Sequence, residues 1–193
     1  MNSDIDKAVQ ILNSGGIIIF PTDTAFGIGC RIDRIDAIER LFNLRQRPIR
    51  MATPVLVSSI EMAKKYWESL EANVEEKLIK KYWPGALTIV LKARKDLVPS
   101  LVRGGGGNIG IRMPNDKQIL EIIEKTGVPI LGPSANIHGE QTPYSKNMLN
   151  KYLVQSVDFV LEGECSIKNA STVVDCTKTP WQILRKGAVE LKI

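Results

Sequence analysis

Histidine is nearly absent from this chain of 193 residues, in which His138 is the only one. Serine–histidine triads and histidine-based metal clusters are therefore all but excluded. The longest apolar runs have about five residues, far short of the roughly 20 that cross a bilayer. No charged n-region followed by an apolar h-region opens the sequence, so we expect no signal peptide. The cysteines, Cys30, Cys165 and Cys176, are few, odd in number and widely spaced, which argues against a disulfide framework. We therefore expect a reducing, cytoplasmic location and no membrane partner.

The composition is otherwise that of an ordinary globular protein. Hydrophobic residues make up 44% of the chain and charged residues 24%, so a sizeable core is expected. The length predicts one domain, over residues 1–193. The formal net charge of +5 favours an anionic partner, such as a nucleotide, an RNA or an acidic metabolite, without choosing among them.

One stretch, residues 16–30, joins a buried strand to a polar exit. It begins with a glycine, three isoleucines and a phenylalanine, an apolar run typical of a short buried strand. Pro21 ends the backbone pairing because proline has no N–H to donate. Thr22, Asp23 and Thr24 then place three oxygen-bearing side chains where the strand ends, a position at which open α/β sheets bind ligands. Taken alone, the stretch is equally well a polar turn between two strands.

Two arginines, Arg45 and Arg47, follow a predicted helix and precede Pro48. Proline disfavours helical backbone at the residue before it, so we expect an extended segment in which both side chains point the same way. Adjacent cations repel unless an anion lies between them, and guanidinium groups bind oxyanions through paired hydrogen bonds. The pair predicts an anion site, although two solvated surface arginines would give the same sequence.

A second short buried strand also runs into a polar exit. Ser134 and Asn136 stand two residues apart just after it, so a hydroxyl and an amide can face one ligand. Arg112 lies among apolar residues in another strand pattern, where its cation must face solvent or a ligand. Trp83 is expected to be a buried structural plug, and His138 an exposed loop residue without a catalytic role.

Periodicity places the secondary structure. Helices are predicted over residues 4–12, 33–43, 59–66, 74–82, 118–125 and, weakly, 148–152. Strands are predicted over residues 17–20, 53–57, 87–91, 108–113, 128–131, 157–161, 171–176 and 181–184. Asp33 or Asp36 could cap the second helix. The four glycines at residues 104–107 lack the lysine and hydroxyl of a P-loop and favour a flexible loop. Strands alternate with helices early and cluster late, so the fold class is α/β with a mixed, parallel and antiparallel, sheet and flanking helices.

Seven segments match one known family in order. Residues 21–30, PTDTAFGIGC, resemble the PTDTVYGLGC signature of the YrdC-like family, the threonylcarbamoyl-AMP synthases. The likeness continues through residues 45–48, 83–85, 109–114, 134–136, 171–175 and 183–188. Because the segments cover nearly the whole chain, the sequence is identified as a member of this family.

The resemblance implies a fold and an activity. The fold is a twisted mixed sheet with a concave, basic substrate face, as a single YrdC-like domain without the additional C-terminal domain of longer members. The activity is condensation of L-threonine, bicarbonate and ATP to threonylcarbamoyl-AMP and pyrophosphate, with Mg²⁺ accompanying ATP. A downstream tRNA threonylcarbamoyltransferase complex would then modify an adenosine next to the anticodon of certain tRNAs.

The resemblance also implies the site. Arg45 and Arg47 are the expected catalytic cations, with Arg47 on the threonine carboxylate or nascent carbamate and Arg45 on carbamate or phosphate. Thr22 and Thr24 are expected to line a threonine pocket that includes Arg47. The residues expected to bind the nucleotide are Ser134, Asn136, Arg112, Ser171 and Arg185.

Three departures from the family pattern keep other functions open. Arg45 occupies the position of a lysine, Phe26 that of a tyrosine, and residues 49–53 differ from the usual sequence. Some YrdC-like paralogues also carry an arginine at the lysine position, so a paralogue of unknown substrate is one alternative. A non-catalytic RNA- or nucleotide-binding module is another, which the positive charge permits. A carbamoyl-transfer enzyme is a third, but such proteins are larger and multidomain.

Overall fold

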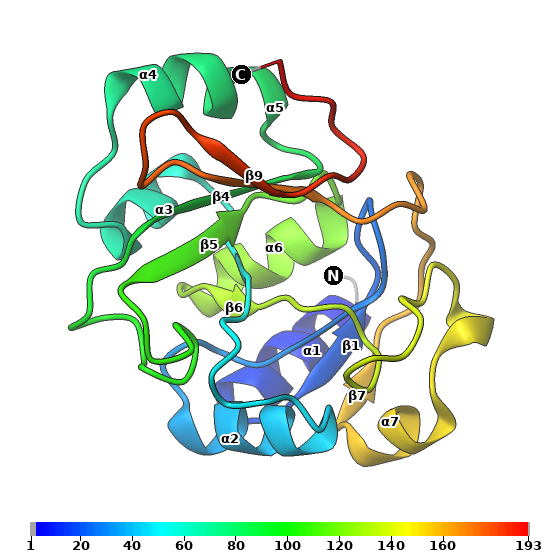
Figure 1. Cartoon of the computed structure of the whole chain (residues 1–193). Helices are drawn as coiled ribbons and strands as arrows, with labels where there is room; N and C mark the ends of the chain where they lie inside the picture. Colours follow the sequence, from blue (N-terminus) through cyan, green and yellow to red (C-terminus); the bar gives the residue numbers. More distant parts are fainter. Residues whose placement is uncertain (1–2, 193) are drawn as a thin grey trace.

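The computed structural model describes residues 3–192, which form two β-sheets with helices around them (Figure 1). The helices are α1 (Ser3–Asn13), α2 (Ile35–Leu44), α3 (Ile60–Tyr66), α4 (Ala72–Val74), α5 (Lys80–Tyr82), α6 (Lys117–Thr126) and α7 (Lys151–Ser156). A π-helical turn, Glu75–Ile79, joins α4 to α5, and a 3-10 turn, Lys146–Met148, precedes α7. The strands are β1 (Ile18–Phe20), β2 (Gly27–Gly29), β3 (Val55–Leu56), β4 (Leu87–Lys92), β5 (Asn108–Arg112), β6 (Ile130–Leu131), β7 (Phe159–Val160), β8 (Thr172–Asp175) and β9 (Gln182–Arg185).

Both sheets are mixed, which confirms the predicted fold class. The smaller has the order β2-β1-β7, and the larger has the order β6-β3-β5-β4-β8-β9. The β1–β7, β3–β5 and β4–β8 pairs are parallel, and the remaining pairs are antiparallel. Isolated bridges from Gly27 to Ser134 and from Arg31 to Ile130 connect the two sheets. The two polar strand exits are thereby brought together.

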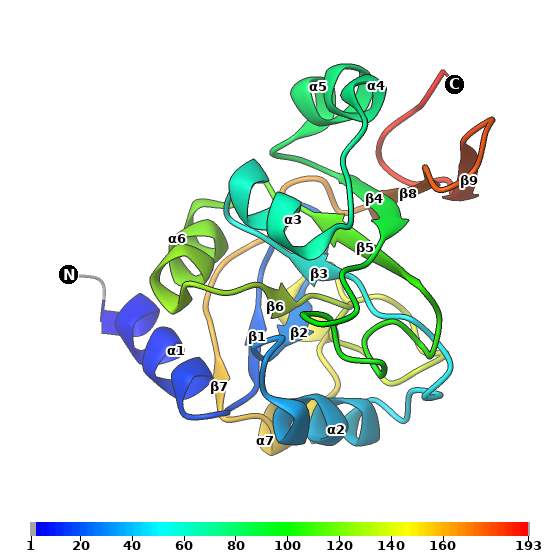
Figure 2. The ribbon, with the colours of Figure 1, turned by 90° about the vertical axis from the view of Figure 1, so that its left-hand side faces the viewer.

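Two hydrophobic clusters hold the elements in place. One lies between α1, α6, β1 and β6, where the apolar faces of the helices meet, and Figure 2 shows α1 and α6 side by side. The other fills the space under the larger sheet and α2 and includes Trp67 and Trp83, whose stacked rings lie 5.9 Å apart between centroids. Trp83 also donates from Nε1 to the Leu87 carbonyl oxygen at 2.7 Å, which confirms its structural role. No helix among residues 3–192 is long and apolar enough to span a membrane.

The side-chain cap of α2 differs from the prediction. Ser59 caps α3 and Asp116 caps α6 through their side chains. The expected aspartate cap of α2 is wrong, because Arg34 occupies the N-cap position and makes no side-chain cap. Asp33 instead forms an ion pair with Arg31 at 2.8 Å.

Strand alternation decides which side chains face outward from the larger sheet. In β4, Leu87, Ile89 and Leu91 belong to the core, whereas Thr88 and Val90 point away from it. All the strands predicted from sequence are present, most of them shortened or shifted and β4 longer by one residue. Strand β2 was not predicted, because two of its three residues are glycines. Around the predicted helix 148–152, the chain instead forms the 3-10 turn at 146–148 and then α7.

Candidate functional site

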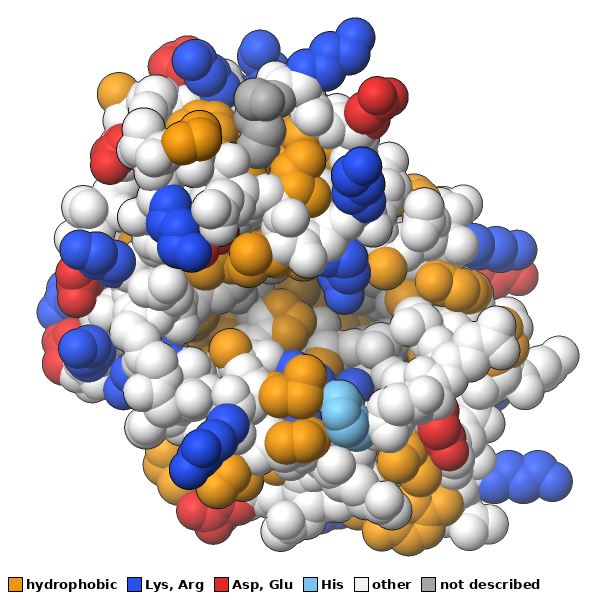
Figure 3. Space-filling view, in the orientation of Figure 1, with side chains coloured by type: hydrophobic (Ala, Val, Ile, Leu, Met, Phe, Trp, Pro, Cys, Tyr) orange, Lys and Arg blue, Asp and Glu red, His pale blue; other side chains and the backbone are white. Residues whose placement is uncertain are grey.

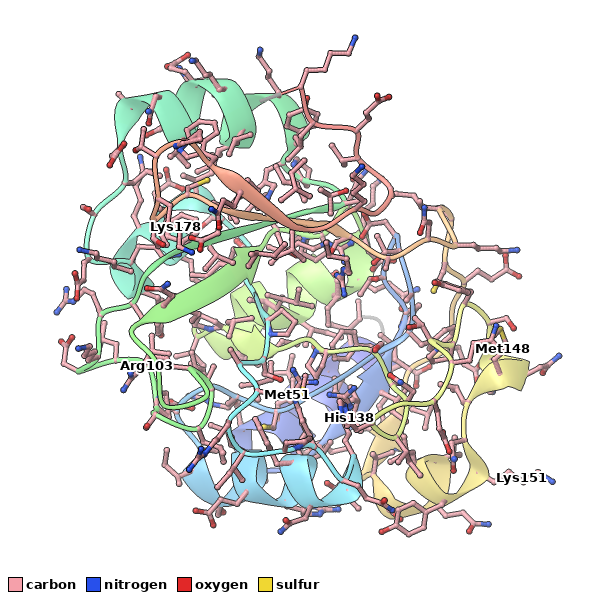
Figure 4. The ribbon with its side chains drawn as sticks, viewed as in Figure 1. Met51, Arg103, His138, Met148, Lys151 and Lys178 are labelled. Carbon is pink, nitrogen blue, oxygen red and sulfur yellow. The ribbon has the colours of Figure 1, made fainter. Side chains whose placement is uncertain are left out.

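One cleft gathers most of the residues that the sequence predicts for the site. It runs between the exit of β1, the end of α2 and the open face of the larger sheet, and we call it the arginine cleft. Figure 3 shows the hollowed face, with the exposed His138 below the hollow. Figure 4, in the same orientation, labels Met51 beside His138. The predicted residues that line it are Thr22, Thr24, Arg45, Arg47, Arg112, Ser134, Ser171 and Arg185. The ninth predicted residue, Asn136, does not line the cleft but contacts Ser134 and Arg45.

The hydroxyl of Thr22 holds the polar exit of β1 in shape. Its Oγ1 donates to the carbonyl oxygen of Ala25 at 2.7 Å and accepts from the backbone N–H groups of Thr24 and Ala25 at 3.2 Å. The Thr24 hydroxyl lies 3.1 Å from it. The Thr22 hydroxyl therefore donates its hydrogen bond within the loop, and its main role is to stabilise the loop conformation.

Arg112 lies at the base of the cleft in an internal ion pair. Its Nη2 donates to Asp23 Oδ1, its Nη1 to Thr24 Oγ1 at 2.6 Å, and its Nε to the Gly85 carbonyl oxygen at 2.9 Å. Asp23 and Arg112 are only 3% and 6% exposed. The prediction that this cation faces solvent or a ligand is therefore wrong in part, because β5 carries it directly against the β1 exit. The sequence did contain an indication of this ion pair, because Asp23 is the one carboxylate at the β1 exit.

The backbone between the paired arginines is a helix end and not the predicted extended segment. Arg45 has φ −85° and ψ −2°, and Gln46 has a positive φ of 50°. The N–H of Arg47 donates to the carbonyl oxygen of Phe42 at 2.9 Å, and that of Gln46 to Asn43 at 3.0 Å. These bonds define a Schellman motif, which ends α2 and still presents both arginines to the cleft.

Arg45 is a buried cation that has no carboxylate partner within residues 3–192. The residue is 2% exposed, its Nε donates to the Asn136 carbonyl oxygen at 3.0 Å, and its Nη2 to Asn136 Oδ1 at 3.3 Å. Its Nη1 has no hydrogen-bond partner among the described residues. Burial, and then the charge of Arg47, lower the pKa of Arg45 to about 10, so it stays charged at neutral pH. A buried unpaired cation is costly, which favours an anion at this position.

Arg47 is held by the segment that follows it. Its guanidinium donates to the carbonyl oxygens of Met51, at 3.3 Å, and of Ala52. Burial lowers the pKa of Arg47 as well. Gly104 packs against this segment, since a β-carbon there would lie 2.6 Å from both the Ala52 nitrogen and the Arg50 oxygen. Backbone hydrogen bonds hold the loop of residues 103–107, which we call the glycine loop, in shape. This loop therefore supports the position of Arg47.

Asn136 organises the second polar exit. Its Oδ1 accepts from Ser134 Oγ at 2.5 Å and from Arg45, while its Nδ2 donates to the carbonyl oxygens of Ile137 at 3.0 Å and Glu140 at 2.8 Å. The amide is thus fully used inside the protein. Asn136 positions Arg45 and Ser134, and Ser134 presents its hydroxyl oxygen to the cleft.

A hydroxyl pair on the larger sheet completes the cleft. Arg185 donates from Nε to the carbonyl oxygen of Ser171 and from Nη2 to Ser171 Oγ, both at 2.9 Å. Ser171 Oγ lies 2.9 Å from Thr88 Oγ1. Sequence reasoning missed Thr88, although a single hydroxyl residue within the apolar run 87–91 could have indicated it.

The cleft therefore has the electrostatic character of an anion site. Four arginines line it, and no aspartate or glutamate of the described chain does so. Of these arginines only Arg112 pairs with a carboxylate in residues 3–192. The same residues assemble no group of three or more metal-ligating side chains.

A family model for Sua5, YciO and YrdC proteins, described as telomere recombination, matches residues 10–187. The chain belongs to this family. The family predicted from the sequence motifs is thereby confirmed, and the mixed sheets with flanking helices are those of its YrdC-like fold.

Two branches of the family resemble the chain. The threonylcarbamoyl-AMP synthase of Pyrococcus abyssi is 31% identical over 96% of this chain and 54% of that protein. A crystal structure of P. abyssi Sua5 complexed with L-threonine has a TM-score of 0.88 and 31% identity, over 95% of this chain and 54% of that one. The crystal structure of Escherichia coli YciO has a TM-score of 0.87 and 26% identity, over 97% of this chain and 91% of that one. The chain spans about half the length of the P. abyssi synthase.

Proposed function

We propose that the protein is a threonylcarbamoyl-AMP synthase, a nucleotidyltransferase that condenses L-threonine, bicarbonate and ATP and releases pyrophosphate. The observation that carries the proposal is the pair Arg45 and Arg47, buried or half-buried without a carboxylate partner in the described chain, facing one cleft with Thr24 and Ser134. All the reacting groups are anions or become anions, so charge neutralisation and positioning supply the catalysis. The relatives named for this activity support the proposal.

Each arginine has a role suited to its surroundings. Arg47 binds the threonine carboxylate or the nascent carbamate, and Arg45 supplies its positive charge to carbamate or to the α-phosphate from the wall of the cleft. Thr24 and Ala25 form the wall next to the amino acid, with Thr22 behind them as a brace. No side chain acts as a covalent nucleophile.

The nucleotide contacts fall to the other side of the cleft. The hydroxyls of Ser134 and Ser171 and the guanidinium of Arg185 bind phosphate and ribose oxygens. Arg112 and Asn136 act through the residues they hold in place. Mg²⁺ would accompany the triphosphate, since this ion usually keeps most of its ligands from phosphate and water.

The product requires a partner. A mixed anhydride of a carbamate and AMP hydrolyses readily, so a tRNA threonylcarbamoyltransferase complex in the cytoplasm takes it up for threonylcarbamoyladenosine formation. RNA binding by this chain itself is a weaker part of the proposal, supported by its charge of +5.

The test is exchange of pyrophosphate into ATP that depends on both threonine and bicarbonate. Arg47→Ala should lower this exchange at least 100-fold, about 3 kcal/mol, because the variant loses a charge-assisted contact to a reacting group. Arg94→Ala, which removes an exposed arginine paired with Asp96, is the matched control and should retain full activity. Full activity in a folded Arg47→Ala protein would contradict the assignment.

A second candidate is a YciO-like paralogue acting on an unknown substrate. The chain and E. coli YciO cover nearly all of one another, whereas the chain covers about half of the P. abyssi synthase. Arg45, at the position of the family's lysine, separates the two candidates. If the wild-type protein is inactive and Arg45→Lys gains threonine-dependent exchange, the paralogue assignment is correct.

A further inference from the structure

The loop that follows β1, residues 21–25, carries the side chains that the proposed function places next to the amino acid. Thr22, Thr24 and Ala25 line the arginine cleft from this loop. The Thr22 hydroxyl makes the hydrogen bonds within the loop, and sheet pairing resumes only at Gly27 in β2. The position of the loop backbone therefore depends on contacts from outside its own strands.

The chain that leaves β7 lies against this loop. Strand β7 runs parallel to β1, with Ile18 opposite Phe159 and Ile19 opposite Val160, so the two strands end at the same edge of the smaller sheet. Figure 1 shows the segment after β7 beside the blue loop after β1. Residues 163–167 of this segment make the contact, and we call them the β7 exit.

The β7 exit holds the backbone of the loop through hydrogen bonds. The N–H of Ile167 donates to the carbonyl oxygen of Asp23 at 2.7 Å, and the Ser166 hydroxyl donates to the same oxygen at 3.4 Å. Within residues 3–192, the loop backbone forms hydrogen bonds with no other distant segment. Arg112 binds side chains of the loop and not its backbone. The β7 exit is therefore the part of the described chain that fixes this backbone.

Gly163 lets the β7 exit and the loop approach each other closely. Its φ is 151°, a backbone conformation that residues with a β-carbon rarely adopt. A β-carbon there would lie 2.6 Å from Pro21 Cγ. The pyrrolidine ring is closed onto the backbone and cannot rotate out of the way, so the added atom would displace Pro21 together with the loop.

We propose that the β7 exit positions the loop for the amino acid and that Gly163 is a positioning residue that sets the affinity for it. The proposal rests on the proposed function, because that function names the amino acid as L-threonine. Ser134, Ser171 and Arg185, on the nucleotide side of the cleft, belong to β6, β8 and β9 or their ends. Displacement of the loop should therefore weaken the binding of the amino acid and leave the nucleotide bound as before.

Calorimetric binding of L-threonine and of ATP with Mg²⁺, together with the exchange assay, tests the proposal on the whole chain. Gly163→Ala should weaken L-threonine binding about tenfold or more and raise the KM for threonine by the same factor, since small displacements of a binding wall are costly. The affinity for ATP and kcat at saturating threonine should stay within about twofold, the pattern expected when only binding of one substrate is lost.

Gly127→Ala is the matched control. Gly127 also has a positive φ, 72°, but a β-carbon there would meet nothing within 4 Å, and the residue does not line the cleft. Alanine at this position strains the backbone without pushing on a neighbour. It should lower the thermal stability and leave both affinities unchanged.

Pro21→Ala separates the contact from a general loss of stability. It removes the ring atom that a β-carbon at position 163 would meet at 2.6 Å, and the nearest atom of residue 21 is then its β-carbon at 3.4 Å. In a double-mutant cycle, Gly163→Ala should weaken threonine binding at least about tenfold with proline at position 21 but less than about threefold with alanine there. The double variant also carries the test if Gly163→Ala alone does not fold.

The contrary outcomes are distinct. A folded Gly163→Ala protein that binds L-threonine as the wild type does overturns the proposal. Equal weakening of threonine and ATP, or a double variant that binds threonine tenfold more weakly than Pro21→Ala, also overturns it. A wild-type protein that binds no L-threonine contradicts the proposed function itself, whereas the other results leave that function in place.

Discussion

The ion pair between Asp23 and Arg112 shows how one residue serves both the fold and the site. Both side chains are nearly buried, and Arg112 bonds the β1 exit, through Thr24, to the turn at Gly85. Each charge is tolerated in the interior because the other is present.

Removing one partner should therefore be costly. Asp23→Ala leaves the Arg112 cation buried without its carboxylate and should lower the free energy of unfolding by about 3–5 kcal/mol in urea titrations. Asp33→Ala breaks the more exposed pair with Arg31 and should cost less than about 1 kcal/mol. Equal effects of the two substitutions would show that Arg112 is satisfied without Asp23.

The thiol of Cys30 gives the protein a predictable alkaline sensitivity. Burial, and then the charge of Asp36, raise the pKa of this thiol to about 12 from an ordinary value of 9.0. The unfolded state therefore loses the proton at lower pH than the folded state. The contribution of this thiol to the free energy of unfolding is fully present below pH 9 and is lost as the pH rises from 9 toward 12.

The expected size of the effect is on the order of 1 kcal/mol between pH 8 and pH 10. Urea titrations at the two pH values measure it, and Cys30→Ala should reduce the loss by about that amount. Lysines and tyrosines titrate in both proteins, so the difference between the two losses isolates the thiol. Identical losses would show that Cys30 ionises in the folded protein.

Among the elements, the glycine loop and the segment 49–52 act as a unit that supports Arg47. Gly104 and Gly105 both have positive φ, 60° and 78°, but only Gly104 approaches the backbone of that segment. A β-carbon at Gly105 would meet nothing within 4 Å.

The two glycines form a matched pair of test positions. Alanine at either carries a backbone penalty of about 1 kcal/mol for its positive φ. Gly104→Ala also forces the Ala52 backbone away, so it should lower threonine-dependent exchange about tenfold or more, whereas Gly105→Ala should retain it. Thermal unfolding separates the shared loss of stability from the specific loss of activity. Equal activity of the two variants would show that the glycine loop does not support Arg47.

Sequence alone predicted the elements better than the geometry of the site. Amphipathic spacing predicted α1, α3 and α6 to within one or two residues, because their apolar faces are regular. The backbone at Gln46 could not be predicted, since a glutamine rarely adopts positive φ and only the packing of α2 fixes it there. The motifs predicted a shared cleft for residues from both halves of the chain, but the partners of Arg112 and Asn136 depend on which strands become neighbours.

At the scale of the whole molecule, the arginine cleft joins the two sheets. Thr24 and Ser134 approach it from the exits of β1 and β6, and Thr88 and Arg185 from the larger sheet. An anion bound between them therefore links parts of the chain that are distant in sequence.

Such a link should appear as thermal stabilisation. Tripolyphosphate at about 100 times its dissociation constant should add about 2.7 kcal/mol to the free energy of unfolding. Differential scanning calorimetry measures the shift, which should shrink as NaCl rises because the charges are screened. Arg45→Met should lose most of the shift, while Arg94→Ala should keep it. A shift that survives in Arg45→Met would place the anion elsewhere.

The stacked indoles of Trp67 and Trp83 also give the protein an intrinsic spectroscopic signal. The two near-parallel rings, with an interplanar angle of 25°, are fixed in an asymmetric environment, so they contribute to the circular dichroism of the folded protein. Trp83 stands two residues before Gly85, whose carbonyl oxygen accepts from Arg112 at the base of the cleft. A ligand that shifts Arg112 should also move this turn, so we expect binding to change the dichroism spectrum of the unlabelled protein.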